Sequence, residues 1–224
     1  YYITCAEMGT CFEHSISVAR SKNLLGPYEN FKCNPLLTHR HLGKKSEIQN
    51  IGHGDLVDTE DGQWYLIMLG TRPIDGITEL GRETFIAEVI WEDGWPVVNP
   101  GIGQVQFEQE INLPCADNLS GEKCFEKEIH VRYTDTLDKR LMTFRHPVSG
   151  MYNIEGENEI SLAPSIATPD NRDKTSSYIG IRQQEYTFRV DIKVKPFTDS
   201  LTKAGLLYIH SDDNYLTLMV SNDG

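Results

Sequence analysis

The chain has 224 residues, enough for one large domain or two small ones, and its 39% hydrophobic and 24% charged residues are typical of a globular protein. Its net charge of −12 repels phosphate groups, which argues against nucleic acid and anionic membranes as partners. No apolar run in the sequence approaches the roughly 20 residues that a transmembrane helix needs.

Short runs rich in β-branched and aromatic residues follow one another along the chain and predict an all-β protein. Gly, Pro, Asn and Asp separate these runs, as turns require, and helical periodicity is scarce. The predicted strands cover residues 1–6, 14–20, 53–58, 63–69, 83–91, 129–133, 139–145, 178–182, 185–194, 203–211 and 214–221.

A weak repeat relates the first predicted strand to a later one. Tyr1-Tyr2-Ile3-Thr4 resembles Trp64-Tyr65-Leu66-Ile67, and each is followed, after a loop, by a β-branched run. A period of roughly 60 residues with several short strands suits one blade of a β-propeller, although strands of a β-sandwich could look similar. Because a propeller closes with about four to eight blades, two blades would imply further sequence.

Both ends of the chain have the pattern of interrupted β-structure. Residues 1–6 have the composition of a strand already under way, and the alternating run 215–220 leads into Asn222-Asp223-Gly224, a strong hairpin-turn signal. These ends lead to the hypothesis that the sequence is an internal segment of a longer protein.

The composition changes at residues 99–103, Asn-Pro-Gly-Ile-Gly, shortly after a hairpin-turn signal at Asp93-Gly94. Because Gly and Pro mark linkers, we expect a first domain over residues 1–103 and a second over residues 104–224. Loops at 113–127 and 164–176 separate the strands of the second domain, as in a β-sandwich.

The cysteines give a weak indication of compartment. There are five, at positions 5, 11, 33, 115 and 124, with no Cys-x-x-Cys pair, so a zinc site is not expected. Cys115 and Cys124 flank a polar loop and could pair, and Asn118-Leu119-Ser120 between them fits a glycosylation acceptor. Both features favour an extracellular protein slightly. Free thiols and a chance tripeptide are at least as good an explanation.

Glu7 follows the first predicted strand, in Ala6-Glu7-Met8-Gly9-Thr10. Gly9 lets the chain turn sharply, so a carboxylate at this strand end could face a cavity. Apolar surroundings raise the pKa of a carboxyl group, which suits a general acid. Local sequence alone favours the alternative, a surface glutamate in a loop.

His53 and Arg82 are the other candidate site residues. Glycines on both sides of His53 would let a ligand approach, so this side chain could bind a metal ion or water. The local sequence favours a hydrogen-bonded core histidine. Arg82 could hold sugar hydroxyls or orient a carboxylate, or it could form a structural ion pair with Glu83, which is favoured.

The three tryptophans, Trp64, Trp91 and Trp95, could form a stacking platform for sugar rings, but their positions in a strand and around a hairpin favour packing. The sequence has no Gly-x-Ser-x-Gly elbow, phosphate loop or dinucleotide fingerprint. A serine nucleophile and a nucleotide cofactor are therefore poorly supported.

Several motifs stand in a characteristic order over residues 1–100. They are Ala6-Glu7-Met8-Gly9-Thr10, His14, Val18-Ala19-Arg20-Ser21, Leu25-Gly26-Pro27-Tyr28-Glu29, Asn34-Pro35-Leu36-Leu37-Thr38, Gly52-His53-Gly54-Asp55-Leu56-Val57, Gly81-Arg82-Glu83-Thr84-Phe85 and Asp93-Gly94-Trp95-Pro96. Their order and spacing resemble the middle of a glycoside hydrolase family 43 enzyme of the β-xylosidase and α-L-arabinofuranosidase branch. The second half resembles that branch less closely, through Arg145-His146-Pro147, Ile181-Arg182-Gln183-Gln184 and Ala204-Gly205-Leu206.

The resemblance implies the C-terminal blades of a five-bladed β-propeller followed by an incomplete concanavalin-like β-sandwich. It implies inverting hydrolysis of terminal xylose or arabinofuranose from xylan or arabinan oligosaccharides, with no required cofactor. Glu7 falls on the family's general acid and Arg82 on a substrate-orienting arginine. His53 falls on a histidine beside a cation or water cluster at the propeller centre, where a structural calcium could bind. A homo-oligomer is compatible with this expectation.

In that family an Asp of the first blade is the base, and an Asp of a middle blade tunes the acid. Both would lie upstream of Tyr1, so the resemblance predicts that this chain alone does not turn over. It departs from the family at Met8, where a glycine is usual, and in its short sandwich, which could lack a loop that closes the site. The alternatives are a non-catalytic carbohydrate-binding protein on the same scaffold and a purely structural sandwich.

Overall fold

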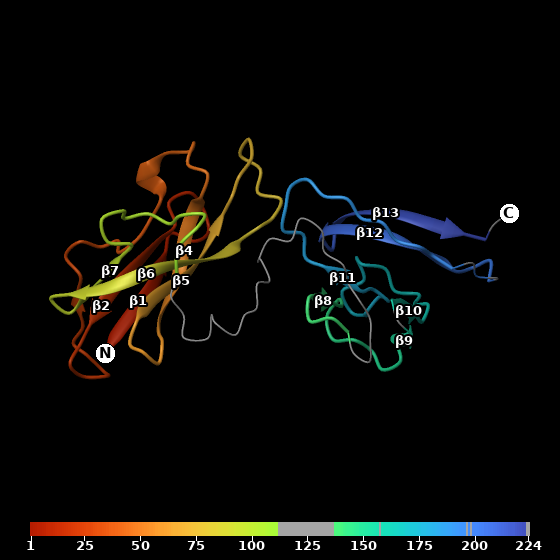
Figure 1. The fold of residues 1–224 in the computed structure, drawn as a ribbon, viewed down its shortest axis with the longest axis horizontal. Coiled ribbons are helices and arrows are strands. Elements are labelled where there is room, and N and C mark those ends of the chain that lie inside the picture. The colour runs from red at the N-terminus through yellow and green to blue at the C-terminus, as the bar shows by residue number, and fades with distance from the viewer. Residues whose placement is uncertain (112–136, 157, 196, 198, 223–224) are drawn as a thin grey trace. The chain divides into compact units, whose positions relative to one another are not determined.

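A computed structural model describes residues 1–111, 137–156, 158–195, 197 and 199–222. It contains two compact units, residues 1–123 and 124–224. In the described parts the one helical element is the 3-10 turn η1 (Arg40–Leu42), and every other element is a strand (Figure 1). None of these described segments forms a helix that could cross a membrane. The all-β prediction is confirmed, whereas the boundary at 103/104 stays a prediction.

Two antiparallel sheets form the first unit (Figure 1). The three-stranded sheet has the order β1-β2-β3, and the four-stranded sheet runs in chain order from β4 to β7. Their bounds are β1 (Tyr2–Glu7), β2 (Ser15–Arg20), β3 (Glu29–Asn30), β4 (Gln49–Asp58), β5 (Trp64–Thr71), β6 (Glu83–Glu92) and β7 (Trp95–Val98).

The weak repeat in the sequence has a structural counterpart. Strand β1 is followed by its antiparallel partner β2, and β5 is followed by its antiparallel partner β6. The two similar segments therefore each begin a strand that pairs with the next strand of the chain, although β1 is at the edge of its sheet and β5 is second in its own.

The hairpin between β6 and β7 confirms the Asp-Gly turn. Asp93 and Gly94 both have positive φ, 51° and 71°, which is the type I′ geometry of two-residue hairpins. The Arg20 guanidinium donates hydrogen bonds to the carbonyl oxygens of both turn residues, at 2.7 and 3.0 Å. It also lies 4.1 Å from the centre of the Trp95 ring. These contacts connect the hairpin turn of the four-stranded sheet to strand β2 of the three-stranded sheet.

The tryptophans of this unit pack against other rings. Trp64 and Trp91 meet edge to face with centroids 5.2 Å apart, and Phe31 stacks on Trp95 at 4.8 Å. These contacts agree with the packing interpretation of the three side chains. The hydrophobic core beneath them is made of Ile16, Leu37, Ile48, Ile51, Leu66, Met68, Ala87, Val89, Val98 and Val105.

His39 is buried, with 2% of its surface exposed, and both of its ring nitrogens are bonded. Nδ1 lies 2.8 Å from the carbonyl oxygen of Ile48, and Nε2 accepts a hydrogen bond from the Val105 amide at 2.9 Å. The ring is therefore neutral with its proton on Nδ1. Burial lowers the pKa of His39 below its ordinary value of 6.5.

This arrangement makes stability depend on pH. Because the unfolded chain protonates His39 more readily than the folded chain does, the contribution of His39 is complete above pH 6.5 and is lost as the pH falls below it. We expect the free energy of unfolding to decrease from pH 7.5 toward about pH 5, and His39→Gln to weaken this dependence. Tryptophan fluorescence during denaturation would measure it, because all three tryptophans lie in the first unit. An unchanged pH dependence in the variant would contradict the assignment.

The second unit contains short antiparallel pairs: β9 with β10, β8 with β11, and β12 with β13 (Figure 1). Their bounds are β8 (Leu141–Met142), β9 (Tyr152–Gly156), β10 (Glu159–Leu162), β11 (Gly180–Ile181), β12 (Lys203–Ser211) and β13 (Asn214–Ser221).

The strand predictions for this unit had mixed outcomes. Those at 203–211 and 214–221 are confirmed, whereas those at 139–145 and 178–182 shrink to the two-residue pair of β8 and β11. The strand predicted over 185–194 is wrong. Its alternating pattern reports side-chain preference, but a strand also needs a neighbouring ladder of hydrogen bonds. Residues 129–133 lie outside the described residues.

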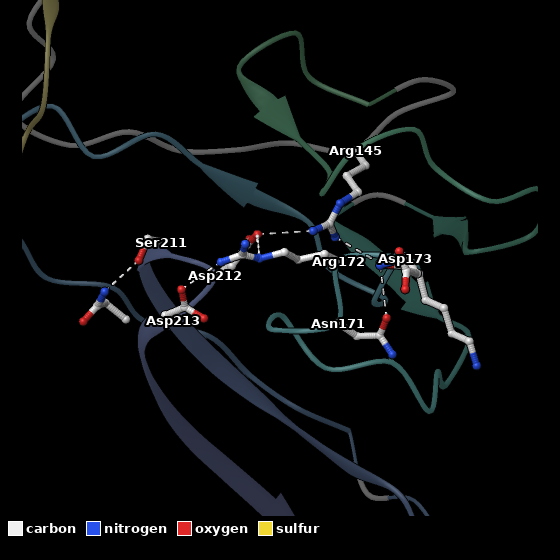
Figure 2. A network of polar contacts seen from close by, with 9 residues as sticks. Arg145, Asn171, Arg172, Asp173, Ser211, Asp212 and Asp213 are labelled. Carbon is white, nitrogen blue, oxygen red and sulfur yellow. Dashed lines mark hydrogen bonds and ion pairs between the residues drawn. The ribbon is translucent and has the colours of Figure 1, made fainter.

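Ion pairs surround the turn between β12 and β13 (Figure 2). Arg172 lies 2.9 Å from Asp213 and 3.6 Å from Asp212, and Arg145 lies 3.4 Å from Asp212. Arg145 also donates to the carbonyl oxygen of Lys174 at 3.1 Å. Exposed pairs such as these contribute at most about 1 kcal/mol each. Together they connect the loops that carry Arg145 and Arg172 to the turn at Asp212 and Asp213.

Candidate active site

Glu7 is the last residue of β1 and is exposed. It pairs in register with Ser15 of β2. The next two residues, Met8 and Gly9, have φ values of 62° and 61°, so the chain turns sharply after Glu7 as the sequence predicted.

Met8 occupies a backbone conformation that favours glycine. The left-handed region costs other residues about 1–2 kcal/mol, and the family resemblance expects a glycine at this position. The Met8 side chain is 61% exposed. It is therefore a bulky, strained residue directly beside the candidate acid.

His53 lies in β4 where the strand is irregular. The register with β5 shifts on both sides of Gly52, and His53 has a φ of 57°. Bulges re-aim side chains, often beside active sites. His53 is exposed while Gly52 and Gly54 are buried, so the interpretation as a core histidine is wrong.

Arg82 lies directly before β6, and its Nη2 is 3.2 Å from Nε2 of His14. The neighbouring Glu83 binds Arg72 through both carboxylate oxygens, at 2.9 and 2.7 Å. This two-pronged ion pair joins the end of β5 to the start of β6 beside Arg82. The carboxylate that the sequence suggested as the partner of Arg82 is thus engaged by Arg72.

His14 brings the candidate residues together. Its ring is 2% exposed, and its Nδ1 lies 2.7 Å from the carbonyl oxygen of Glu7. The same ring lies against Gly52, the residue before His53. The imidazole of His14 is therefore in contact with the backbone of Glu7, with the Arg82 guanidinium group and with Gly52, the neighbour of His53 in the chain.

Sequence reasoning assigned no role to His14, which entered only as one position of the family motif. Its partners are 7 and 68 positions away along the chain. No local pattern could reveal the second partner, because the contact depends on how the two sheets pack.

A pocket of about 460 Å³ lies between β1 and β4 and is lined by Tyr2, Thr4, Asp55, Leu56, Trp64 and Trp91. Its β1 residues come from the start of the strand, whereas Glu7 ends it. At about 3.3 Å per residue, this aromatic pocket is distinct from the surroundings of Glu7.

The described segments place no group of three or more His, Cys, Asp or Glu side chains where they could hold a metal ion. Calcium takes six to eight oxygen ligands, so these residues do not by themselves fit a calcium site at His53. Cys5, Cys11 and Cys33 are free thiols. Cys115, Cys124 and Asn118 lie outside the described residues.

The arrangement combines a carboxyl group, a guanidinium group and an imidazole. A carboxylic acid can donate a proton to a leaving group, and a guanidinium fork can hold oxygen atoms of a ligand. Acid-assisted cleavage of a polar substrate is the chemistry that these groups together support.

Comparison with known proteins gives two family matches. The model of glycosyl hydrolases family 43 matches residues 1–96. The model of the beta xylosidase C-terminal concanavalin A-like domain matches residues 133–224. The predicted order of propeller blades followed by a concanavalin-like β-sandwich is confirmed.

Individual relatives agree with these matches. A xylosidase/arabinosidase of Butyrivibrio fibrisolvens is 42% identical over 98% of this chain and 42% of its own length. The solved structure of the Bacteroides ovatus xyloglucan PUL GH43B is 32% identical, with a TM-score of 0.76 over 98% of this chain and 43% of its own. The GH43 BlXynB protein of Bacillus licheniformis is 29% identical, with a TM-score of 0.78 over 100% of this chain and 43% of its own. The chain thus spans about two fifths of the length of its relatives.

Proposed function

The chain belongs to glycosyl hydrolases family 43, and on that premise we propose that it carries the general acid of a glycosidase. The enzyme removes terminal xylose or arabinofuranose from xylan or arabinan oligosaccharides. The names of the relatives, xylosidase and arabinosidase, support this substrate class. The observation that carries the proposal is the junction at His14, which ties the strand end that bears Glu7 to Arg82.

Each residue has a distinct role in this proposal. Glu7 protonates the glycosidic oxygen as the bond breaks, and Arg82 holds substrate hydroxyls. His53, exposed where the register of β4 is irregular, lies at the sugar. A base must activate water on the opposite face of the sugar, roughly 6.5–9.5 Å from the acid in an inverting enzyme.

The base in this proposal is an Asp of the first propeller blade, contributed by sequence before Tyr1. Residues 1–103 form propeller blades, and residues 104–224 form part of the sandwich. Residues 1–224 alone are then inactive, because removal of one member of an acid–base pair typically costs 10²- to 10⁴-fold.

The test uses the protein as its natural source produces it. We expect hydrolysis of 4-nitrophenyl β-xyloside or 4-nitrophenyl α-arabinofuranoside, with the preferred sugar given by the larger kcat/KM. Nuclear magnetic resonance of the first-formed sugar should show the inverted anomer. Retention of configuration would refute the inverting mechanism. Oligosaccharide binding without hydrolysis would favour the carbohydrate-binding alternative, and normal turnover by residues 1–224 alone would exclude an upstream base.

A further inference from the structure

The loop over residues 39–46, here called the basic loop, concentrates positive charge in an acidic protein. The net charge of the chain is −12, yet residues 30–46 contain no Asp or Glu. Arg40, Lys44 and Lys45 lie in the basic loop, and all three are exposed. Among the ion pairs of the described residues, none includes these three side chains. An anionic ligand would therefore meet positive charge that no protein carboxylate has yet paired.

Buried side chains fix the backbone of the basic loop. The buried Gln49 amide donates to the carbonyl oxygens of Lys44 and Ser46, at 2.7 and 2.8 Å. The loop begins at the buried His39, whose ring is bonded at both nitrogens. Gly43, with a φ of 82°, allows the turn between them. Because the backbone is already ordered, a ligand that binds the cations has less ordering entropy to overcome.

The basic loop is joined to the candidate active site through Thr38. The Thr38 hydroxyl donates to the carbonyl oxygen of His14 at 2.8 Å and accepts from the Arg40 amide at 3.3 Å. The His14 amide in turn donates to the carbonyl oxygen of Cys11 at 3.0 Å, and its ring contacts Arg82. The loop therefore starts one hydrogen-bonded residue away from the imidazole of the candidate site.

The segment that follows β1 faces the same loop. Lys44 Nζ lies 5.8 Å from the centre of the Phe12 ring. A hydrogen bond from Cys11 is the main cause of the lowered pKa of Glu13, and the positive charges of Lys44 and Arg40 lower this pKa further. Two cations of the basic loop thus already favour a negative charge beside the site, and both remain open to solvent.

We propose that Arg40, Lys44 and Lys45 bind the carboxylate of a uronic acid that the oligosaccharide substrate carries on a sugar next to the one removed. Guanidinium and ammonium groups are strong hydrogen-bond donors to carboxylates. The strongly negative charge of the whole chain disfavours a polyanion such as nucleic acid, so a ligand with a single carboxylate fits better. The inference rests on the proposed glycosidase activity and needs no assignment of the proton donor.

The test compares two substrates in the protein as its source produces it: a neutral xylo-oligosaccharide, and the same oligosaccharide with one glucuronic acid. We expect Lys44→Gln combined with Lys45→Gln to raise KM for the acidic substrate about 3- to 10-fold at low salt, and to leave KM for the neutral substrate unchanged. The difference should shrink at about 0.5 M salt, because exposed charges are screened. Lys44→Arg combined with Lys45→Arg should retain the affinity.

Lys22→Gln combined with Lys32→Gln is the matched control, since it removes the same charge from the same unit. Both lysines are exposed, and Lys22 follows the opposite end of β2 from His14. We expect this pair to change neither KM. Glu13→Gln should have the opposite sign to the basic-loop variant and lower KM for the acidic substrate about twofold, because it removes a competing carboxylate.

The outcomes separate this inference from the proposed function. Equal changes in KM on both substrates, an equal change in the control pair, or a loss that persists at high salt would overturn the uronic acid site. Hydrolysis of the neutral substrate without any hydrolysis of the acidic one would overturn it as well. If the unmutated protein hydrolyses neither substrate, the proposed function is wrong. Titration calorimetry with the two oligosaccharides then decides the site by itself, because equal affinities would overturn it and tighter binding of the acidic one would support it.

Discussion

The Glu7→Gln variant should lose about 10²- to 10⁴-fold in kcat on xylo- or arabino-oligosaccharides. Glutamine has nearly the size and shape of glutamic acid but cannot give up a proton to the glycosidic oxygen. On 2,4-dinitrophenyl glycosides the loss should be much smaller, because that leaving group departs without protonation. Steady-state kinetics with both kinds of substrate, in the protein as its source produces it, would measure the difference.

Glu13→Gln is the matched control for this experiment. Glu13 is an exposed glutamate in the same loop, six positions beyond Glu7 along the sequence. A hydrogen bond from Cys11 lowers the pKa of Glu13 below its usual 4.5, so it is ionised at neutral pH and has no proton to give. We expect its replacement to leave both activities nearly unchanged. Equal losses in the two variants would show that any charge removed from this loop matters, and would overturn the assignment of Glu7.

Strands β1, β2, β5 and β6 and the second half of β4 could be predicted because each has a strong local pattern, whereas β3 and β7 were not predicted. The Asp93-Gly94 turn was visible for the same reason, since two consecutive left-handed residues favour Asp and Gly. The strands of the second unit were harder to predict from the sequence. Strands β9 and β10 were not predicted, and the strand predicted over 185–194 does not form. Pairing between distant segments decides these cases, and local composition does not contain it.

The candidate site shows the same difference between features that a local pattern predicts and features that depend on contacts between distant segments. Glu7 and Arg82 could be named singly, because each belongs to a local motif beside a strand. The exposure of His53 depends on the irregular register of β4 against β5, which no pattern within β4 reveals. The role of His14 depends on contacts across the two sheets. The sequence therefore proposed which groups could carry the chemistry, whereas the packing of the two sheets showed that His14 contacts both the backbone of Glu7 and the Arg82 side chain.

Gly52→Ala should have a large effect with the smallest change in side chain. The new methyl group would overlap the His14 ring, which the bonds of Thr38 and Cys11 to the His14 main chain leave little room to move. Overpacking of a buried site typically costs 1–3 kcal/mol in stability. We expect a loss of that size in the free energy of unfolding, together with at least a 10-fold loss in kcat/KM.

Gly54→Ala separates the two effects, because this glycine flanks His53 on its other side. Its Cβ would lie 2.6 Å from Cδ1 of Ile16 in the core, so it should cost stability without displacing the His14 ring. A double variant, Gly52→Ala with His14→Ala, sharpens the comparison. Removal of the ring relieves the overlap, so its stability should exceed that expected from adding the two single losses, while activity stays low. If activity returned together with stability, the imidazole would be filling space at this junction, and the bridge from Glu7 to Arg82 would have no catalytic consequence.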